Sequence, residues 1–265
     1  MEIHPNERGY KRIVHDIIHN GSYRQTRNGY VRSLPNQILK ITGLDHGLFP
    51  IITTRQIFYK GVLGEYAAMI RGPKNVKDFE KWGCNYWSYL GNDDGSLNLD
   101  YGNLWIDADG RNQMQEVAYE LRNNPTSRRL LITGWDPGQS NDTDLPCCHY
   151  SYQFWRDDNY LDLLWTQRSG DFMVGIPSDM VFAATMLSCF ASYACVKPRS
   201  ITMIIGDAHV YEEHIETAKK QLDKVWWEPP KFRLKQQYNI QGFKPEDLEI
   251  FQYKHRGKLD YVFKP

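Results

Sequence analysis

The stretch Asp-Leu-Pro-Cys-Cys-His-Tyr-Ser-Tyr-Gln-Phe-Trp at 144–155 places two adjacent cysteines after a proline and at the start of an aromatic-rich run. Short runs of this composition, bounded by turn residues, favour a half-buried strand. Further strand-like runs stand on both sides, at 128–135, 160–167 and 200–206. The cysteine pair is therefore expected where a turn enters a sheet.

Helical spacing of apolar residues predicts the other elements. Residues 7–20 form an amphipathic pattern, with Gly21 as the expected C-terminal cap. Residues 179–196 are apolar on almost every side, which predicts a helix buried in the centre of the fold, and 208–222 form a further predicted helix. The Gly-, Asn- and Arg-rich segment 21–33 is expected to be a loop.

The composition predicts one α+β domain over residues 1–265, with helices packed on a mixed sheet. The chain is 41% hydrophobic, and no linker or repeat divides it. Its 32 basic residues balance 32 acidic ones, which disfavours nucleic acid as a partner. We find neither a bilayer-spanning apolar run nor a signal peptide, and expect a cytoplasmic protein, in the host cytoplasm if it is viral.

The five cysteines are expected to be reduced thiols, because their number is odd and the chain is too large to need disulfides. A metal site is not predicted, since adjacent Cys147, Cys148 and His149 cannot all point at one ion. Taken alone, the stretch fits either a turn with two buried thiols or half of a nucleophilic site.

Three other segments place polar groups beside apolar ones: "PTSRRLLITGW" at 125–135, "QRSGDFMVGIPSD" at 167–179 and "GDAHVYEEH" at 206–214. Charged groups next to a buried helix cost desolvation energy unless something satisfies them. Together with Pro-Cys-His before Gln-Phe, these segments resemble, in order, the motifs of the thymidylate synthase family. Weaker matches extend the resemblance over nearly the whole chain, at 26–29, 49–55, 64–72, 100–105 and 246–253.

The resemblance implies a thymidylate synthase-like fold in which one face of the sheet forms a homodimer interface. It also implies transfer of a one-carbon unit from 5,10-methylenetetrahydrofolate to carbon 5 of a pyrimidine nucleoside monophosphate, without a metal. Carbon 5 becomes nucleophilic when a thiolate adds to carbon 6, so the site needs an activated cysteine.

By motif the nucleophile is Cys148, and Cys147 stands where the family has proline. Arg168 is expected to lower the pKa of that thiol and to bind phosphate. Glu65, in an otherwise apolar helical stretch, matches the glutamate that relays protons to the base. The catalytic set implied by the resemblance is completed by His149, Tyr101 and Asp179.

The resemblance assigns the remaining residues to two ligands. The phosphate would be held by Arg168 with Arg27, Arg128 and Arg129, the last two reaching across the dimer interface from the neighbouring subunit. The rest of the nucleotide would contact Gln167, Ser169, Asp179, His209 and Tyr211, the last two at the sugar 3′-hydroxyl. The folate would contact Trp82, Asp171 and Gly175. Alternatively, the Arg pair is a solvated strand end, and His209 and Tyr211 form a helix entry.

Asp179 departs from the family pattern, which has asparagine at this place. A carboxamide matches the N3–H donor and O4 acceptor of uracil, whereas a carboxyl group accepts from N4 of cytosine and bridges to N3 when either carries a proton. This favours a cytosine nucleotide and the branch of the family that hydroxymethylates deoxycytidylate or cytidylate, as in bacteriophages. The alternative is that Asp179 only caps the helix 179–196.

The C-terminal tail "RGKLDYVFKP" at 256–265 differs from the small aliphatic ending with which thymidylate synthases close the site. A tail that excludes water less completely favours addition of water to the one-carbon intermediate over hydride transfer to it, so we predict 5-hydroxymethylation of dCMP. The alternatives are methylation of dCMP or dUMP, and CMP as substrate. A nucleic-acid cytosine methyltransferase is disfavoured because no G-x-G-x-x-G loop occurs; a non-catalytic nucleotide sensor stays open.

Overall fold

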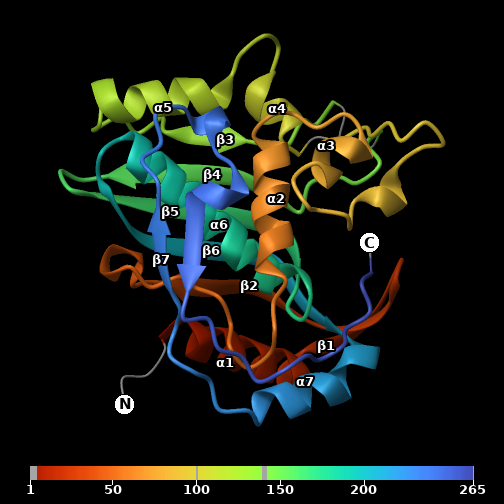
Figure 1. The fold of residues 1–265 in the computed structure, drawn as a ribbon. Coiled ribbons are helices and arrows are strands. Elements are labelled where there is room, and N and C mark those ends of the chain that lie inside the picture. The colour runs from red at the N-terminus through yellow and green to blue at the C-terminus, as the bar shows by residue number, and fades with distance from the viewer. Residues whose placement is uncertain (1–4, 100, 139–141, 265) are drawn as a thin grey trace.

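The computed structural model describes residues 5–99, 101–138 and 142–264, so Asp100 of the weak match at 100–105 lies outside the described residues. Its main sheet has the strand order β1-β2-β6-β5-β4-β3 (Figure 1). The strands are β1 (Ser22–Thr26), β2 (Gly29–Ile41), β3 (Leu131–Thr133), β4 (His149–Arg156), β5 (Tyr160–Asp171) and β6 (Lys197–Tyr211). Strands β5 and β6 are parallel and the other neighbours antiparallel, which confirms the predicted mixed sheet. A smaller antiparallel pair joins β7 (Lys231–Leu234) and β8 (Leu248–Phe251).

The helices cover one face and the ends of this sheet. They are α1 (Pro5–Asn20), α2 (Tyr59–Met69), α3 (Val76–Glu80), α4 (Asn103–Ile106), α5 (Gln113–Asn123), α6 (Gly175–Tyr193) and α7 (Ile215–Leu222). In Figure 1, α2 and α6 occupy the centre, α1 and α7 lie below them, and α5 lies above beside β3. The α+β class with helices packed on a mixed sheet is confirmed. No helix of the described ranges is long and apolar enough to cross a membrane.

The core lies between the sheet and α6. On β5, Leu161, Leu163 and Trp165 are buried at alternate positions and face the helix side. Helix α6 is buried over most of its length, as expected for a helix apolar on nearly every side. On the opposite face of the sheet, the described side chains include the exposed apolar residues Ile38, Leu131 and Trp155.

The composition of residues 21–33 predicts a loop, and this prediction is wrong. The segment forms β1, a tight turn and the first part of β2. Every residue of β1 is exposed, so this edge strand lacks the apolar alternation that identifies a half-buried strand. Gly29 adopts a φ of 129° at the turn. Gly21 directly follows α1, as predicted. Glycine is needed there for a steric reason, since a Cβ at this position would lie 2.3 Å from the Ile17 oxygen.

Two predicted helices have different limits. The predicted helix 208–222 begins as strand, because β6 continues to Tyr211 with Ala208 and Val210 buried in the sheet. A short 3-10 turn, η3 (Glu212–His214), then leads into α7. The predicted helix 179–196 begins earlier, at Gly175, because Pro177 is tolerated in a first turn, where its missing N–H has no helical acceptor.

Candidate active site

Cys148 lies immediately before β4, and both its backbone N–H and its backbone carbonyl are hydrogen-bonded. Its N–H donates to the Tyr101 hydroxyl, and its carbonyl accepts from the Arg168 N–H at 2.8 Å. The Arg168 guanidinium donates to the carbonyls of Pro146, at 2.8 Å, and Cys147, at 2.9 Å, and its Nη2 lies 3.8 Å from Cys148 Sγ. Arg168 therefore both fixes the turn that carries the thiol and places a positive charge beside it.

The pKa of the Cys148 thiol is nevertheless raised above its ordinary value, mainly because the thiol is buried. Arg168 and the Tyr101 hydroxyl act in the opposite direction, but their combined effect is smaller. Arg168 therefore lowers the pKa of Cys148, as expected, but burial raises it by more, so the pKa of the thiol lies above its ordinary value. At neutral pH the thiol of the free enzyme therefore carries its proton.

Cys147 has a different environment from its neighbour. It is fully buried, and its thiol donates to the Gly134 carbonyl at 2.6 Å. The two cysteines therefore do not form a pair with one function: Cys148 borders the polar site and Cys147 belongs to the core.

His149, the first residue of β4, is buried among aromatic rings. Its ring centroid lies 4.5 Å from that of Trp165 and 4.8 Å from that of Tyr101, and its Nδ1 is 2.5 Å from the Tyr152 hydroxyl. Burial lowers the pKa of His149 to about 3. The imidazole is therefore neutral at physiological pH and forms part of the wall behind Cys148.

Glu65 stands in the middle of α2, where the neighbouring side chains are apolar. Both carboxylate oxygens accept hydrogen bonds, Oε2 from the Tyr86 hydroxyl at 2.8 Å and Oε1 from the Trp87 indole N–H at 2.7 Å. Burial raises the pKa of Glu65 to about 7, against the effect of these two donors. A carboxyl group with this pKa can take up and release a proton near neutral pH.

Asp179 is joined to Gln167 across the site. The Gln167 amide donates to Asp179 Oδ2 at 2.8 Å and to the Ser169 carbonyl at 2.9 Å, while its own oxygen accepts from the Trp165 indole at 3.0 Å. Burial raises the pKa of Asp179 to about 7, and the charge of Glu65 adds to the effect. Because α6 begins at Gly175, Asp179 lies inside the helix and is not its N-cap, so the capping alternative is wrong.

The parallel pairing of β5 with β6 brings the other predicted nucleotide and folate residues to the same edge. Asp171 is paired in register with His209, and Ser169 with Asp207. The His209 and Tyr211 rings lie perpendicular, with centroids 5.4 Å apart. Both residues are on β6, and Tyr211, its last residue, also directly precedes the 3-10 turn that leads into α7, so the helix-entry alternative describes the position of Tyr211 but not that of His209.

Asp207 connects this edge to the β1–β2 hairpin. It accepts from the Ser33 hydroxyl at 2.7 Å and from Arg24 at 2.8 Å, and lies 3.5 Å from His209 Nδ1. The interaction with His209, followed by those with Ser33 and Arg24, lowers the pKa of Asp207 to about 2, so the carboxylate is ionised. The hairpin turn carries Arg27, whose charge acts on the hydroxyl of Tyr211 and therefore reaches the site.

Arg128 and Arg129 are not brought to Cys148 within one chain. They are exposed, between α5 and β3, and line an open cavity of about 1170 Å³ together with α5 side chains such as Glu116, Tyr119 and Glu120. None of the other predicted site residues lines that cavity.

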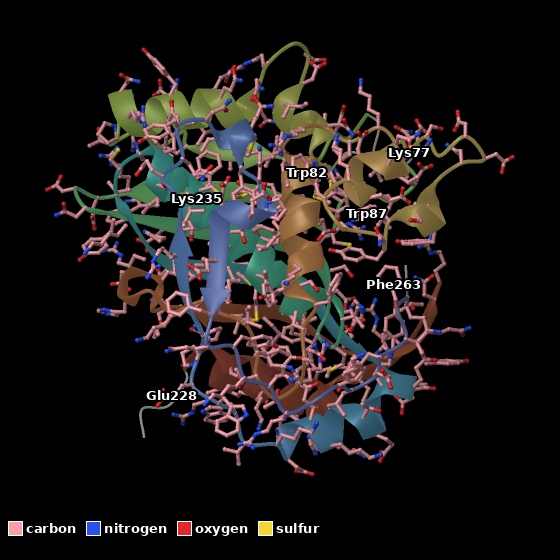
Figure 2. The ribbon with its side chains drawn as sticks, viewed as in Figure 1. Lys77, Trp82, Trp87, Glu228, Lys235 and Phe263 are labelled. Carbon is pink, nitrogen blue, oxygen red and sulfur yellow. The ribbon has the colours of Figure 1, made fainter. Side chains whose placement is uncertain are left out.

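Trp82 and Trp87, which lie in the same segment, have different contacts. The Trp82 indole packs against the Arg71 guanidinium, 4.6 Å from the ring centroid, whereas the indole that reaches Glu65 belongs to Trp87. Figure 2 shows both tryptophans in the segment beside α2. The role of Trp82 at the folate therefore stays a prediction, and Trp87 is a further site residue that the loosely matching segment 74–99 did not identify.

Tyr86 was likewise missed by the sequence reasoning, as was Tyr89, whose hydroxyl lies within electrostatic range of Cys148, Glu65 and Arg27. The signal for them was the aromatic density of 82–89, which also suits a core. Gly175 opens α6, and a Cβ there would lie 3.8 Å from Asp179 Oδ2. Within the described ranges, no group of three or more His, Cys, Asp or Glu residues could hold a metal ion.

Comparison with known proteins agrees with this geometry. The family model described as thymidylate synthase matches residues 8–264. The thymidylate synthase of Mycoplasma pneumoniae is 30% identical over 240 residues, covering 80% of this chain and 84% of that protein. The thymidylate synthase of Mycoplasma genitalium is 28% identical over 236 residues, covering 78% of this chain and 82% of that protein. A probable thymidylate synthase of Escherichia phage T5 is 33% identical over 232 residues, covering 81% of this chain and 82% of that protein. The chain therefore belongs to the thymidylate synthase family, whose members transfer one-carbon units to pyrimidines.

Proposed function

We propose that this enzyme transfers a one-carbon unit from 5,10-methylenetetrahydrofolate to carbon 5 of a cytosine nucleoside monophosphate, preferring dCMP, and that water completes the reaction to give the 5-hydroxymethyl product. The observation that carries the choice of cytosine is the hydrogen-bonded pair of Gln167 and Asp179.

The pair supports cytosine through its fixed orientation. Because the Trp165 indole donates to the Gln167 oxygen, the amide nitrogen must face Asp179 Oδ2. The other carboxyl oxygen is then available to accept from N4 of cytosine. With a pKa of about 7, the carboxyl group also exists in a protonated form that can donate to N3. The ionised carboxylate would place an acceptor against O4 of uracil, and an unmatched buried group costs about 1–3 kcal/mol.

The remaining groups support nucleophilic addition. Cys148 would attack carbon 6, and Arg168, beside the sulfur, would stabilise the thiolate that forms. We assign proton transfer to Glu65, whose pKa of about 7 suits this work. Arg27, Arg168, His209 and Tyr211 would hold the phosphate and the sugar.

The residues present fit the folate co-substrate. Asp171 is a half-buried carboxyl group near His209, suited to accept from the N–H donors of a pteridine, and the Trp87 indole offers an aromatic surface. When bound, the folate supplies the one-carbon electrophile. We assign Gly175, at the start of α6, to the same pocket because it leaves space beside Asp179.

Reductive methylation is the second candidate, and two observations favour it. The similar proteins are named thymidylate synthases. The tail also packs on the body of the protein: Tyr261 donates to Gln221 at 2.8 Å, and the Phe263 ring lies 5.2 Å from that of Tyr89. Figure 2 shows Phe263 below Trp87 on the same side of the molecule. A tail held in this way would help to exclude water.

The product identifies the reaction. Mass spectrometry after incubation with methylenetetrahydrofolate and either dCMP, dUMP or CMP is expected to show the fastest conversion for dCMP, to a hydroxymethyl product. No dihydrofolate absorbance should develop, because hydration of the exocyclic methylene leaves the folate unoxidised. Faster conversion of dUMP would contradict the role of Asp179, and dihydrofolate formation would establish methylation instead.

We further propose a homodimer formed through the face of the sheet opposite the helices, with Arg128 and Arg129 completing the phosphate site of the neighbouring subunit. Two features support it. Ile38, Leu131 and Trp155 are large apolar side chains exposed on that face, and exposed apolar surface of this kind marks an interaction site. The Arg pair is exposed and away from the nucleophile of its own chain.

Mixed dimers test the shared site. Arg128→Ala/Arg129→Ala and Cys148→Ser proteins are each expected to be inactive, and to regain activity when unfolded together and refolded. The hybrid dimer then contains one site with an intact thiol from one chain and intact arginines from the other. If mixing restores no activity while both variants remain dimeric, the arginines serve their own subunit.

A further inference from the structure

We propose that Asp207 is a positioning residue that keeps the hydrogen of the His209 ring on Nδ1, so that Nε2 accepts a hydrogen bond from the 3′-hydroxyl of the nucleotide. The proposal rests on the proposed function only in assigning His209 to the sugar. Asp207 and His209 stand two residues apart on β6, which places both side chains on the same face of the strand and lets them interact directly.

The groups of Asp207 that lie near Nδ1 of His209 are both acceptors. The Asp207 carbonyl oxygen is 3.4 Å from this nitrogen, and the carboxylate Oδ1 is 3.5 Å from it. Because the carboxylate is ionised, it cannot donate a hydrogen bond. A neutral imidazole has one N–H and one acceptor nitrogen, so an Nδ1 that faces two acceptors must carry the hydrogen. Nε2 is then the nitrogen that accepts.

The Asp207 carboxylate is itself held by the β1–β2 hairpin. Its Oδ1 accepts from the Ser33 hydroxyl at 2.7 Å, and its Oδ2 accepts from Arg24 Nη1 at 2.8 Å. Arg24 Nη1 also donates to Ser33 Oγ at 3.3 Å. Ser33 is buried and is paired in register with His209. Each carboxylate oxygen therefore has a defined donor, and the oxygen bonded to Ser33 is the one that faces His209.

Two other polar side chains lie beside the His209 ring. Asp171 is paired with His209 on the neighbouring strand β5, but its Oδ1 accepts from the Met173 N–H at 2.7 Å. The Tyr211 ring is perpendicular to that of His209, with the centroids 5.4 Å apart. The Tyr211 hydroxyl can donate to the 3′-oxygen while the 3′-hydroxyl donates to Nε2. This arrangement selects nucleotides with a free 3′-hydroxyl over those that lack it or carry a phosphate there.

The test is the nitrogen NMR spectrum of the free enzyme, labelled at its histidine nitrogens and recorded at about pH 9, where unperturbed imidazole is neutral. The His209 signals are assigned by their loss in His209→Gln. We expect the hydrogen on Nδ1 in the unmodified enzyme, and a hydrogen on Nε2 there overturns the proposal. In Asp207→Asn the amide oxygen is expected to face the charged Arg24, which turns the NH₂ group toward His209 and moves the hydrogen to Nε2. If the hydrogen stays on Nδ1 in this variant, the carboxylate does not position the ring.

A second substitution separates this effect from general loosening of the strand. Adding Arg24→Met to Asp207→Asn frees the amide to turn its oxygen toward Nδ1, so the hydrogen is expected to return to Nδ1. A hydrogen that remains on Nε2 in the double variant contradicts the proposed orientation. Asp16→Asn is the matched control, because Asp16 Oδ1 also lies 3.5 Å from a histidine Nδ1, that of exposed His15. It should leave the His209 signals unchanged.

Nucleotide binding connects the position of the hydrogen to the sugar. In calorimetry, loss of the 3′-hydroxyl between dCMP and dideoxycytidine monophosphate is expected to weaken binding about tenfold in the unmodified enzyme and much less in Asp207→Asn. Asp207→Asn should raise KM more than it lowers kcat, because this contact is present before and during the reaction. An equal effect of the 3′-hydroxyl in both proteins overturns its link to Asp207. The NMR measurement needs no nucleotide, and dUMP with dideoxyuridine monophosphate replaces the cytidine pair if cytosine proves to be the wrong base.

Discussion

Cys148→Ser is expected to reduce nucleotide turnover by at least about a thousandfold while nucleotide binding is retained. The thiol borders the site beside Arg168, and its backbone is fixed by Tyr101 and by the Arg168 N–H. A serine hydroxyl keeps the size and these backbone bonds, but its pKa is far above that of a thiol. The variant therefore loses the nucleophile and little else.

Turnover is measured by product mass and binding by calorimetry with dCMP. Cys195→Ser is the matched control, because Cys195 is an exposed thiol outside the proposed site, and its loss should leave both measurements unchanged. Retained turnover in Cys148→Ser would remove Cys148 as nucleophile. Normal turnover in the unmodified enzyme also rules out the non-catalytic nucleotide sensor.

Asp179→Asn is expected to move the preference from dCMP toward dUMP, changing the ratio of the two kcat/KM values by about a hundredfold. Gln167 holds one carboxyl oxygen, so the substitution changes mainly the group presented to the base. A carboxamide donates to O4 of uracil and accepts from its N3–H, and it would oppose the N4 donor of cytosine with a second donor. Asp158→Asn, on the exposed β4–β5 turn, is the control.

The pH dependence of binding gives this prediction a second measurement. Because the pKa of Asp179 is raised to about 7, the form that donates to N3 is present below this pH and is lost as pH rises through it. The affinity for dCMP should therefore fall above about pH 7 in the unmodified enzyme and change less in Asp179→Asn. If Asp179→Asn has the same preference between dCMP and dUMP as the unmodified enzyme, residues other than Asp179 determine that preference.

The family and the general layout could be predicted from the sequence because they depend on local and ordered signals. The aromatic run after Cys148 predicted β4, and the apolar residues 179–196 predicted a buried helix, which α6 confirms although it begins four residues earlier, at Gly175, and ends three residues earlier, at Tyr193. Polar edge strand β1 could not be predicted, since nothing in its own residues distinguishes a strand that is exposed throughout from a loop.

The sequence by itself determined which chemical groups are present: a thiol in Pro-Cys-Cys-His, a glutamate in an apolar stretch and an aspartate where the family has asparagine. Only the tertiary structure decided how they are tuned. Burial outweighs the charge of Arg168 at Cys148, and it raises the pKa of both Glu65 and Asp179 to about 7. The structure also brought the Trp87 indole to Glu65 and separated Arg128 from the thiol of its own chain. These outcomes depend on desolvation and on contacts between distant segments, which residue order does not contain.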